Sequence, residues 1–297
     1  MKFHLVLALI LAAVSAGCAT SHKDARSLPI EFQAHRGGLE EGPENTLTAI
    51  RRAWRVRGAV PEVDVRTTVD NVFVCLHDET LARTTNAPAD VASTPVSQLR
   101  YDEIRRWDAG ARFDRRLAGE PVPRLTDVLD EMVDNPKRQI YLDLKDADID
   151  RLRRVLEVYH VQDQVIYVAS SQEACQAIRA ALPGARTMTW LSGTREDIKQ
   201  RFSELAETGF DGISQLQFHL KVYDPGPPYT YDLGPEFLSQ ALMATNKAGV
   251  DLQLRPFDYD DYTLAALMKL GVRWYVTNAP DHFAHTVAEA HKLLGEE

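Results

Sequence analysis

Strand-like and helix-like segments alternate along most of the chain, and this alternation limits the possible folds more than any other feature. The first part has a strand at 30–34, a helix at 46–56, strands at 60–67 and 72–77, and a helix at 125–133 with Thr126 as a candidate cap. The remainder has strands at 139–144, 164–169, 186–191, 212–216, 251–255 and 272–277, followed by helices at 150–159, 172–181, 195–208, 235–248, 259–270 and 281–294. Strands separated by helices form a parallel sheet, and about eight units close it into a barrel. We therefore predict an α/β fold, a TIM (β/α)8 barrel.

Two connections are longer than barrel loops usually are. Residues 78–123 are mostly polar, with a possible short helix at 97–107, and residues 217–234 are rich in Pro and Tyr. Long loops on a barrel usually serve its active-site face, although an insertion without a function is the alternative. We predict one barrel over residues 30–297, with a small insertion at about 78–123 after the second strand unit.

The N-terminus has the pattern of an export signal. Lys2 precedes an apolar run at 3–14, which is shorter than the roughly 20 residues that span a bilayer. The segment Ser15-Ala16-Gly17-Cys18 resembles a bacterial lipoprotein signal, in which the Cys is lipidated, and a plain secretory signal is the alternative. We predict a signal peptide at 1–17, a lipidated tether at 18–29, and an exported, membrane-anchored lipoprotein that faces the periplasm.

The other two cysteines show no spaced disulfide framework. Cys75 lies in an apolar strand-like run and Cys175 in a helix-like run. Both are interpreted as small buried side chains, and a disulfide between them stays open.

The charge balance excludes one class of partner. The formal net charge is −9 at pH 7, and binding of nucleic acid needs clustered Lys and Arg. A phosphate-bearing small substrate remains compatible with this charge, because a few local cations or a metal ion can outweigh it.

Candidate chemistry begins at the end of the first strand. His35 and Arg36 follow that strand directly and would point into the barrel mouth, where barrel enzymes act. Gly37 and Gly38 allow the backbone to turn sharply beside a ligand. A buried histidine and a surface arginine are the alternative interpretation.

A pair of acids lies on the next strand. Glu62 and Asp64 are two residues apart and share one face. Two carboxylates that point into a barrel repel, and a divalent cation such as Mg²⁺ or Ca²⁺ relieves that repulsion. Alternatively, Val63 and Val65 form the buried face and both acids face solvent.

Two further strand ends carry polar groups. His77 follows the strand at 72–77, so with His35 it could share acid–base catalysis of phosphodiester cleavage. Asp143 and Lys145 share a strand face, as a third metal ligand and a phosphate-binding cation.

Several motifs, in order, resemble the glycerophosphodiester phosphodiesterase family. They are His35-Arg36-Gly37 with Pro43-Glu44-Asn45-Thr46, the run from Glu62 to Arg66, the run from His77 to Thr85, the stretch ending Asp108-Ala109-Gly110, and the closing Val276-Thr277-Asn278-Ala279-Pro280-Asp281. The resemblance covers residues 30–285 and is strongest at 33–145.

The resemblance implies roles for seven residues. His35 and His77 would be the general acid–base pair, and Glu62, Asp64 and Asp143 would bind one divalent cation, Mg²⁺ or Ca²⁺. Arg36 and Lys145 would hold the phosphate. Which histidine is the acid, and whether a cyclic phosphate forms first, stays open.

Three features depart from the family pattern. Asp143 stands where the family more often has Glu, and an Asp here resembles the related spider-venom phospholipase D branch, which acts on larger lipids. Leu252-Gln253-Leu254-Arg255 replaces the usual Trp-Thr-Val-Asn strand, and Arg255 could contact a charged headgroup or be a surface cation. The loop at 217–234 has no family pattern, and its candidate pocket residues are His219, Lys221, Tyr223, Tyr229 and Tyr231.

The predicted function is metal-dependent hydrolysis of glycerophosphodiesters to glycerol 3-phosphate and an alcohol. A lysophospholipase D-like activity on lysophospholipids at the membrane is the alternative. A non-catalytic surface-binding lipoprotein is disfavoured, because both histidines and the acid pair are present.

Overall fold

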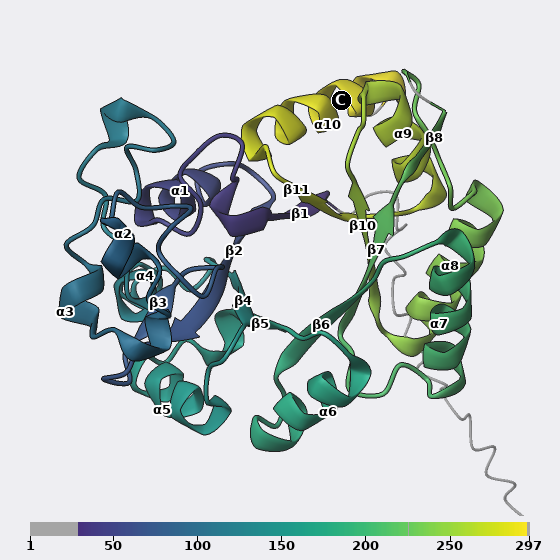
Figure 1. Cartoon of the computed structure of the whole chain (residues 1–297). Helices are drawn as coiled ribbons and strands as arrows, with labels where there is room; N and C mark the ends of the chain where they lie inside the picture. The colour runs from purple at the N-terminus through teal and green to yellow at the C-terminus, as the bar shows by residue number, and fades with distance from the viewer. Residues whose placement is uncertain (1–28, 225, 296–297) are drawn as a thin grey trace, which may run out of the picture.

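The computed structural model describes residues 29–224 and 226–295, and eight parallel strands in this part of the chain form a closed barrel (Figure 1). Around the barrel they follow chain order: β1 (Glu31–Ala34), β2 (Ala59–Thr67), β4 (Ile140–Leu144), β5 (Val165–Val168), β6 (Arg186–Leu191), β7 (Gln215–Leu220), β10 (Asp251–Pro256) and β11 (Trp274–Thr277). The barrel closes because β1 pairs in parallel with both β11 and β2. The predicted TIM barrel is thus confirmed.

Helices surround the barrel (Figure 1). In chain order they are α1 (Leu47–Ala53), α4 (Leu125–Val133), α5 (Ile149–Tyr159), α6 (Gln172–Ala181), α7 (Arg195–Glu207), α8 (Pro235–Ala248), α9 (Asp261–Leu270) and α10 (Pro280–Leu293). The cap predicted at Thr126 is wrong. Helix α4 starts one residue earlier, and the carboxylate of Asp127 accepts a hydrogen bond from the backbone N–H of Arg124 at 2.9 Å.

One predicted strand is displaced. The strand expected at 212–216 is β7, which begins at Gln215 and ends at Leu220. Gly212 has a φ of 80°, which belongs to the turn after α7 and not to a strand. The interior positions of β7 are polar, with Gln217 buried and His219 half-buried, so its second half has the composition of a loop.

The predicted loop at 217–234 also contains a hairpin. After β7 ends at Leu220, β8 (Val222–Asp224) and β9 (Thr230–Tyr231) pair antiparallel. This hairpin lies at the carboxyl end of the barrel, because it follows directly on β7.

The insertion between β2 and α4 has its own small core. It begins with β3 (Phe73–Cys75), which pairs antiparallel with β2, and continues with the short helices α2 (Ala89–Ala92) and α3 (Tyr101–Ile104). The 3-10 turn Val96–Gln98 and α3 together stand for the short helix expected at 97–107. Its buried side chains are Val74, Leu76, Leu81, Val96, Leu99, Ile104, Ala109 and Val122.

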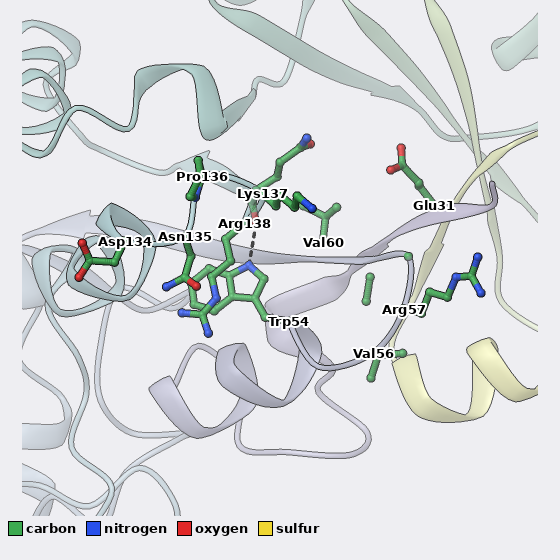
Figure 2. A pocket seen from close by; sticks show the side chains of 13 residues that line it. Glu31, Trp54, Val56, Arg57, Val60, Asp134, Asn135, Pro136, Lys137 and Arg138 are labelled. Atoms are coloured by element: carbon green, nitrogen blue, oxygen red, sulfur yellow. Dashed lines mark hydrogen bonds between the residues drawn. The ribbon is translucent and has the colours of Figure 1, made fainter. Parts of the chain in front are cut away.

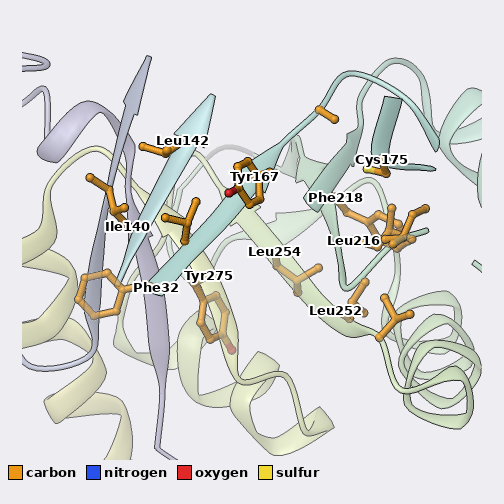
Figure 3. Packing of buried hydrophobic residues seen from close by; sticks show 14 of the residues in the cluster. Phe32, Ile140, Leu142, Tyr167, Cys175, Leu216, Phe218, Leu252, Leu254 and Tyr275 are labelled. Carbon is orange, nitrogen blue, oxygen red and sulfur yellow. The ribbon is translucent and has the colours of Figure 1, made fainter. Parts of the chain in front are cut away.

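The main core lies between the barrel and its helices. Figure 3 shows part of it, with Phe32, Leu216, Phe218 and Leu254 directed away from the barrel axis. Cys75 and Cys175 are both buried and free, so burial is confirmed and the disulfide is excluded. Burial of these apolar faces stabilises the fold by about 25 cal/mol for each Å² removed from water.

The barrel interior holds buried polar side chains beside an apolar cluster, and several of the polar groups are paired. The Tyr141 hydroxyl donates to Gln215 at 2.8 Å, and the Gln217 amide nitrogen donates to Gln253 at 2.6 Å and to Gln33 at 3.2 Å. These bonds satisfy buried polar groups that would otherwise be costly. They also fix the orientation of Gln217, whose side-chain oxygen faces His219.

The segment expected at 1–17 and all but the last residue of the tether expected at 18–29, Cys18 included, lie outside the described residues, so lipidation and export stay predictions. Among the described helices, none combines the length and apolarity that crossing a membrane requires.

Candidate active site

The site is built first on the turn that follows β1. His35, Arg36 and Gly37 form one 3-10 turn in which Arg36 has a φ of 52° and Gly37 a φ of 79°. A left-handed backbone costs about 1–2 kcal/mol at a residue other than glycine. At Arg36 this conformation directs the backbone N–H to the Glu62 carboxylate, at 2.7 Å. The first turn is therefore tied to the acids of β2.

Three carboxylates meet at the ends of β2 and β4. Glu62 and Asp64 are 2% and 1% exposed, and Asp64 lies opposite Asp143 in the parallel register. One oxygen from each of Glu62, Asp64 and Asp143 lies within 4.8 Å of the others. Val63 and Val65 are buried against the helices, so the alternative with solvent-facing acids is wrong.

The charges in this cluster are unbalanced. Burial, followed by the neighbouring Asp64 and Asp143, raises the pKa of Glu62 well above its usual range. Burial also raises the pKa of Asp143, although Lys145 opposes it at 2.7 Å. Burial would raise the pKa of Asp64 too, but Lys145, Asn45 and Arg36 together lower it.

A divalent cation fits this donor set. Hard carboxylate oxygens converge on one point, and additional positive charge there would offset the repulsion that disfavours ionisation of Glu62. Glu62, Asp64 and Asp143 therefore suggest a divalent-cation site.

Two phosphate-binding candidates border the cluster. The Lys145 ammonium lies 3.0 Å from Asp64 and 2.7 Å from Asp143, and Arg36 lies 3.4 Å from Asp64 and 3.0 Å from Glu44. Burial would lower the pKa of Lys145, but the two carboxylates raise it, so the ammonium stays charged.

Asn45 belongs to a motif of the first turn, and its contacts give it a role that the motif alone does not indicate. Its side-chain nitrogen donates to Asp64 at 2.8 Å, and its oxygen accepts from the Asp64 backbone N–H at 2.9 Å. Asn45 is buried and has a φ of 59°. These two hydrogen bonds together fix the Asp64 carboxylate.

His35 has a defined tautomer. Its Nδ1 lies 2.9 Å from the side-chain oxygen of Asn278, whose nitrogen donates to Glu40 at 3.0 Å. Because Glu40 fixes the orientation of Asn278, the His35 Nδ1 carries the hydrogen and Nε2 has the lone pair. Burial, followed by Arg255 and Arg36, lowers the pKa of His35 to about 3. The ring is therefore neutral near pH 7.

His77 has a different environment. Its Nδ1 lies 2.7 Å from Asp78, and its side chain is 37% exposed. Arg83 bonds to Asp78 at 2.7 Å and to Glu44, which in turn pairs with Arg36. A chain of ion pairs thus connects the turn that holds His35 to His77. Apart from the place of Arg83 in a motif, no sequence feature indicates this link.

The candidate pocket residues from the loop at 217–234 do not gather in one place. His219 faces Gln217 at 2.9 Å and lies beside Phe257, with 5.8 Å between ring centroids. Lys221 donates to the carbonyl of Gly193, and the Tyr231 hydroxyl donates to the carbonyl of Asp258. The Tyr229 backbone N–H bonds to Thr263, and Tyr223 is 71% exposed.

A cavity of about 460 Å³ lies at the opposite end of the barrel and contains none of these residues (Figure 2). Trp54, Arg57, Lys137 and Arg138 line it beside the first residues of β1 and β2. The Arg138 guanidinium lies 4.7 Å from the Trp54 ring, and Trp54 donates to the carbonyl of Gln139 at 2.9 Å. Barrel enzymes act at the carboxyl ends of their strands, so the carboxylate cluster is the candidate site.

Comparisons with known proteins identify the family. A sequence profile described as the glycerophosphoryl diester phosphodiesterase family matches residues 35–282. The chain is 24% identical over 255 residues to a glycerophosphodiester phosphodiesterase of Bacillus altitudinis, which covers 84% of this chain and 94% of that protein. It is 29% identical over 156 residues to one of Caldanaerobacter subterraneus subsp. tengcongensis, covering 50% of this chain and 62% of that protein, less than two thirds.

Solved structures share the fold. A glycerophosphodiester phosphodiesterase of Agrobacterium tumefaciens has a TM-score of 0.66 and 25% identity, covering 86% of this chain and 99% of that one. A phosphodiesterase of Oleispira antarctica, solved in complex with the product sn-glycerol-3-phosphate, has a TM-score of 0.67 and 20% identity, covering 89% of this chain and 99% of that one.

Proposed function

This chain belongs to the glycerophosphoryl diester phosphodiesterase family, and we propose that it hydrolyses glycerophosphodiesters to glycerol 3-phosphate and an alcohol. The observation that carries the proposal is the meeting of His35, Arg36, Lys145 and three carboxylates at the carboxyl end of one barrel. The product named for the Oleispira antarctica structure supports the substrate class.

Glu62, Asp64 and Asp143 are proposed to hold one divalent cation, Mg²⁺ or Ca²⁺. When bound, the cation would supply positive charge that stabilises a phosphodiester and its transition state. Asn45 and the backbone N–H of Arg36 keep the carboxylates in place. Arg36 and Lys145 add fixed positive charge for the phosphate oxygens.

The two histidine environments support an assignment of acid and base. His35 is neutral and its Nε2 is free to accept a proton from the attacking water. The Nδ1 of His77 lies 2.7 Å from the Asp78 carboxylate, which orients the ring, and His77 is assigned as the acid that donates a proton to the leaving alkoxide. The water oxygen forms a bond to phosphorus, the bond from phosphorus to the alcohol oxygen breaks, and one proton moves at each histidine. Attack by a hydroxyl of the substrate, which would give a cyclic phosphate, requires the same two groups.

Lysophospholipids are the second candidate substrates. Phe257 is 51% exposed and Tyr223 is 71% exposed, and both follow strands whose carboxyl ends form the barrel mouth. Exposed aromatic side chains there offer apolar contact to an acyl chain. The shorter Asp143 carboxylate agrees with the branch that acts on larger lipids.

Export and attachment through a lipidated Cys18 are proposed on the sequence alone. Two acyl signals or more would give stable anchoring, since each buried methylene contributes about 0.8 kcal/mol.

The test is release of glycerol 3-phosphate from glycerophosphocholine by the purified protein, with Mg²⁺, Ca²⁺ or EDTA. We expect metal-dependent release, and a loss of about 10²- to 10⁴-fold for His35→Ala or His77→Ala. His285→Ala changes an exposed histidine on α10 and should keep full activity. If the protein releases choline or a cyclic phosphate from lysophosphatidylcholine but does not cleave glycerophosphocholine, lysophospholipids are the substrates. Full activity in both histidine variants would reject the mechanism.

A further inference from the structure

Arg255 brings a cation to the side of the barrel mouth opposite the carboxylates. It lies at the end of β10, in register with His219 on β7, whereas the carboxylates lie on β2 and β4. In Figure 1, β7 and β10 lie on the right of the barrel and β2 and β4 on the left. The Arg255 guanidinium reaches across to within 3.3 Å of the His35 Nδ1. It therefore lies next to the proposed base without being part of the metal cluster.

The contact with His35 does not provide a hydrogen-bond acceptor for the Arg255 guanidinium. The His35 Nδ1 already donates to Asn278, so its hydrogen faces a guanidinium that can only donate. The guanidinium also lies over the Phe257 ring, at 5.0 Å from the centroid. Within the described residues, no carboxylate lies within 4.0 Å of Arg255, whereas Arg36 and Lys145 each have acidic partners at that range.

Within the described residues no acid contacts Arg255 directly, although Glu62 acts on it from a greater distance. Arg255 and Lys221 are the charges that act on His219, and burial followed by these two lowers its pKa to about 4. Burial lowers the pKa of Arg255, Glu62 opposes this effect, and Arg36 adds to it less strongly. A half-buried guanidinium that has no carboxylate partner among the described residues is costly unless a ligand supplies one.

We propose that Arg255 binds a second anionic group of the substrate, a carboxylate or phosphate on its alcohol portion. This inference rests on the proposed function, because it assigns the phosphodiester itself to Lys145, Arg36 and the metal on the β2 and β4 side. A charged hydrogen bond to a half-buried guanidinium contributes about 1.5–3 kcal/mol, which corresponds to roughly 10- to 100-fold in specificity. The enzyme thus selects glycerophosphodiesters whose alcohol is anionic.

A matched pair of substrates tests this selection. Glycerophosphoserine differs from glycerophosphoethanolamine by one carboxylate, so the ratio of their kcat/KM values isolates the contribution of that group. We expect the natural protein to favour glycerophosphoserine by about 10-fold or more. In Arg255→Gln the ratio should fall to about one, and in Arg255→Lys it should lie between, since a point charge replaces a planar fork. Arg55→Gln, which changes an exposed arginine on the amino-terminal side, should leave the ratio unchanged.

Three results would overturn the inference. Equal kcat/KM values for the two substrates in the natural protein would show that it does not select an anionic alcohol. An equal loss on both substrates in Arg255→Gln would mean that Arg255 holds the phosphodiester or positions His35. A ratio that Arg255→Gln leaves intact would place the carboxylate elsewhere. If neither substrate releases glycerol 3-phosphate, the proposed function itself fails, and the inference fails with it.

Discussion

Asn278 and His35, 243 positions apart in the chain, are joined by a 2.9 Å hydrogen bond between the Asn278 side-chain oxygen and the His35 Nδ1. Barrel closure creates this contact. Strand β11 pairs with β1 so that Thr277 lies opposite Ala34, and the next residue of each strand enters the mouth at the same level. The last βα unit therefore sets the tautomer of a histidine in the first.

Asn278→Ala should lower kcat by about 10- to 100-fold, because His35 loses the acceptor that fixes its ring. Asn278→Asp should raise the pKa of His35, since a carboxylate stabilises the imidazolium. Activity would then be lost as pH falls through that raised value. The measurement is the pH dependence of kcat/KM, with the exposed Asn246→Ala as the control. An unchanged profile in both Asn278 variants would show that the bond does not control the base.

The metal site should be visible in stability as well as in activity. A cation that binds only the folded protein adds about 2.7 kcal/mol at 100 times its Kd, so the Tm should rise with Mg²⁺ or Ca²⁺ concentration. Glu62→Gln removes one ligand charge and should abolish the rise. Glu236→Gln, which changes an exposed acid on α8, should keep it.

Asp143→Glu distinguishes metal preference from metal binding. The longer side chain restores the residue that the family more often has, so the Tm rise should persist while the ratio of its Mg²⁺ and Ca²⁺ midpoints changes. A Tm that responds to no divalent cation, in the natural protein and in this variant alike, would reject the site.

Most of the barrel strands could be located in the sequence, because strands that are buried on both faces have a recognisable apolar composition. Strand β7 could not be placed correctly, since Gln215, Gln217 and His219 point into a polar interior and resemble loop residues. Their burial depends on bonds to Gln33 and Gln253, which belong to other strands. Local sequence carries no information about such partners.

The proposed ligands and histidines are recognisable because each lies within or directly after a strand and has a motif around it. Asn278 and Arg83 were named only as members of motifs, because their roles depend on contacts with distant residues, His35 and Glu44. Arg255 was noticed as a departure from the family. Its lack of an acidic partner in the described part of the chain required the three-dimensional contacts.

The ion pair between Asp78 and Arg83 predicts a pH dependence of stability. Hydrogen bonds from Arg83, opposed by burial and aided by His77, lower the pKa of Asp78 from 3.8 to about 2. Because the folded value is depressed, this contribution to the free energy of unfolding is present above about pH 4 and is lost as pH falls through about 2.

Asp78→Asn should therefore be less stable than the natural protein near neutral pH and equal to it near pH 2. Urea unfolding at a series of pH values measures the difference, and the exposed Asp163→Asn serves as the control. A difference that persists unchanged at the acid end would mean that the effect is not electrostatic.

Gly38 should tolerate no side chain. Its φ is 100°, and a Cβ there would lie 2.6 Å from the Pro280 Cδ, between the first turn and α10. Gly38→Ala should lower the free energy of unfolding by about 1–3 kcal/mol or more, from strain and from the displaced helix. Gly184→Ala is a matched control, because Gly184 also has a positive φ, 86°, with nothing within 4 Å of the added carbon. Equal losses in the two variants would attribute the whole effect to backbone strain.

Cys18→Ser tests attachment to the membrane. If Cys18 carries lipid, the natural protein expressed in a bacterium should incorporate labelled palmitate and sediment with membranes, because its acyl chains bury in the bilayer. The variant lacks the thiol that lipidation modifies, so it should lose the label and leave the membrane fraction. Cys175→Ser, which changes a buried cysteine of the barrel, should keep the label. Since Cys18 is not among the proposed site residues, purified Cys18→Ser should hydrolyse a water-soluble glycerophosphodiester at the natural rate. Label that persists in Cys18→Ser would exclude this cysteine as the anchor, and an unlabelled natural protein would leave the plain secretory signal as the correct interpretation.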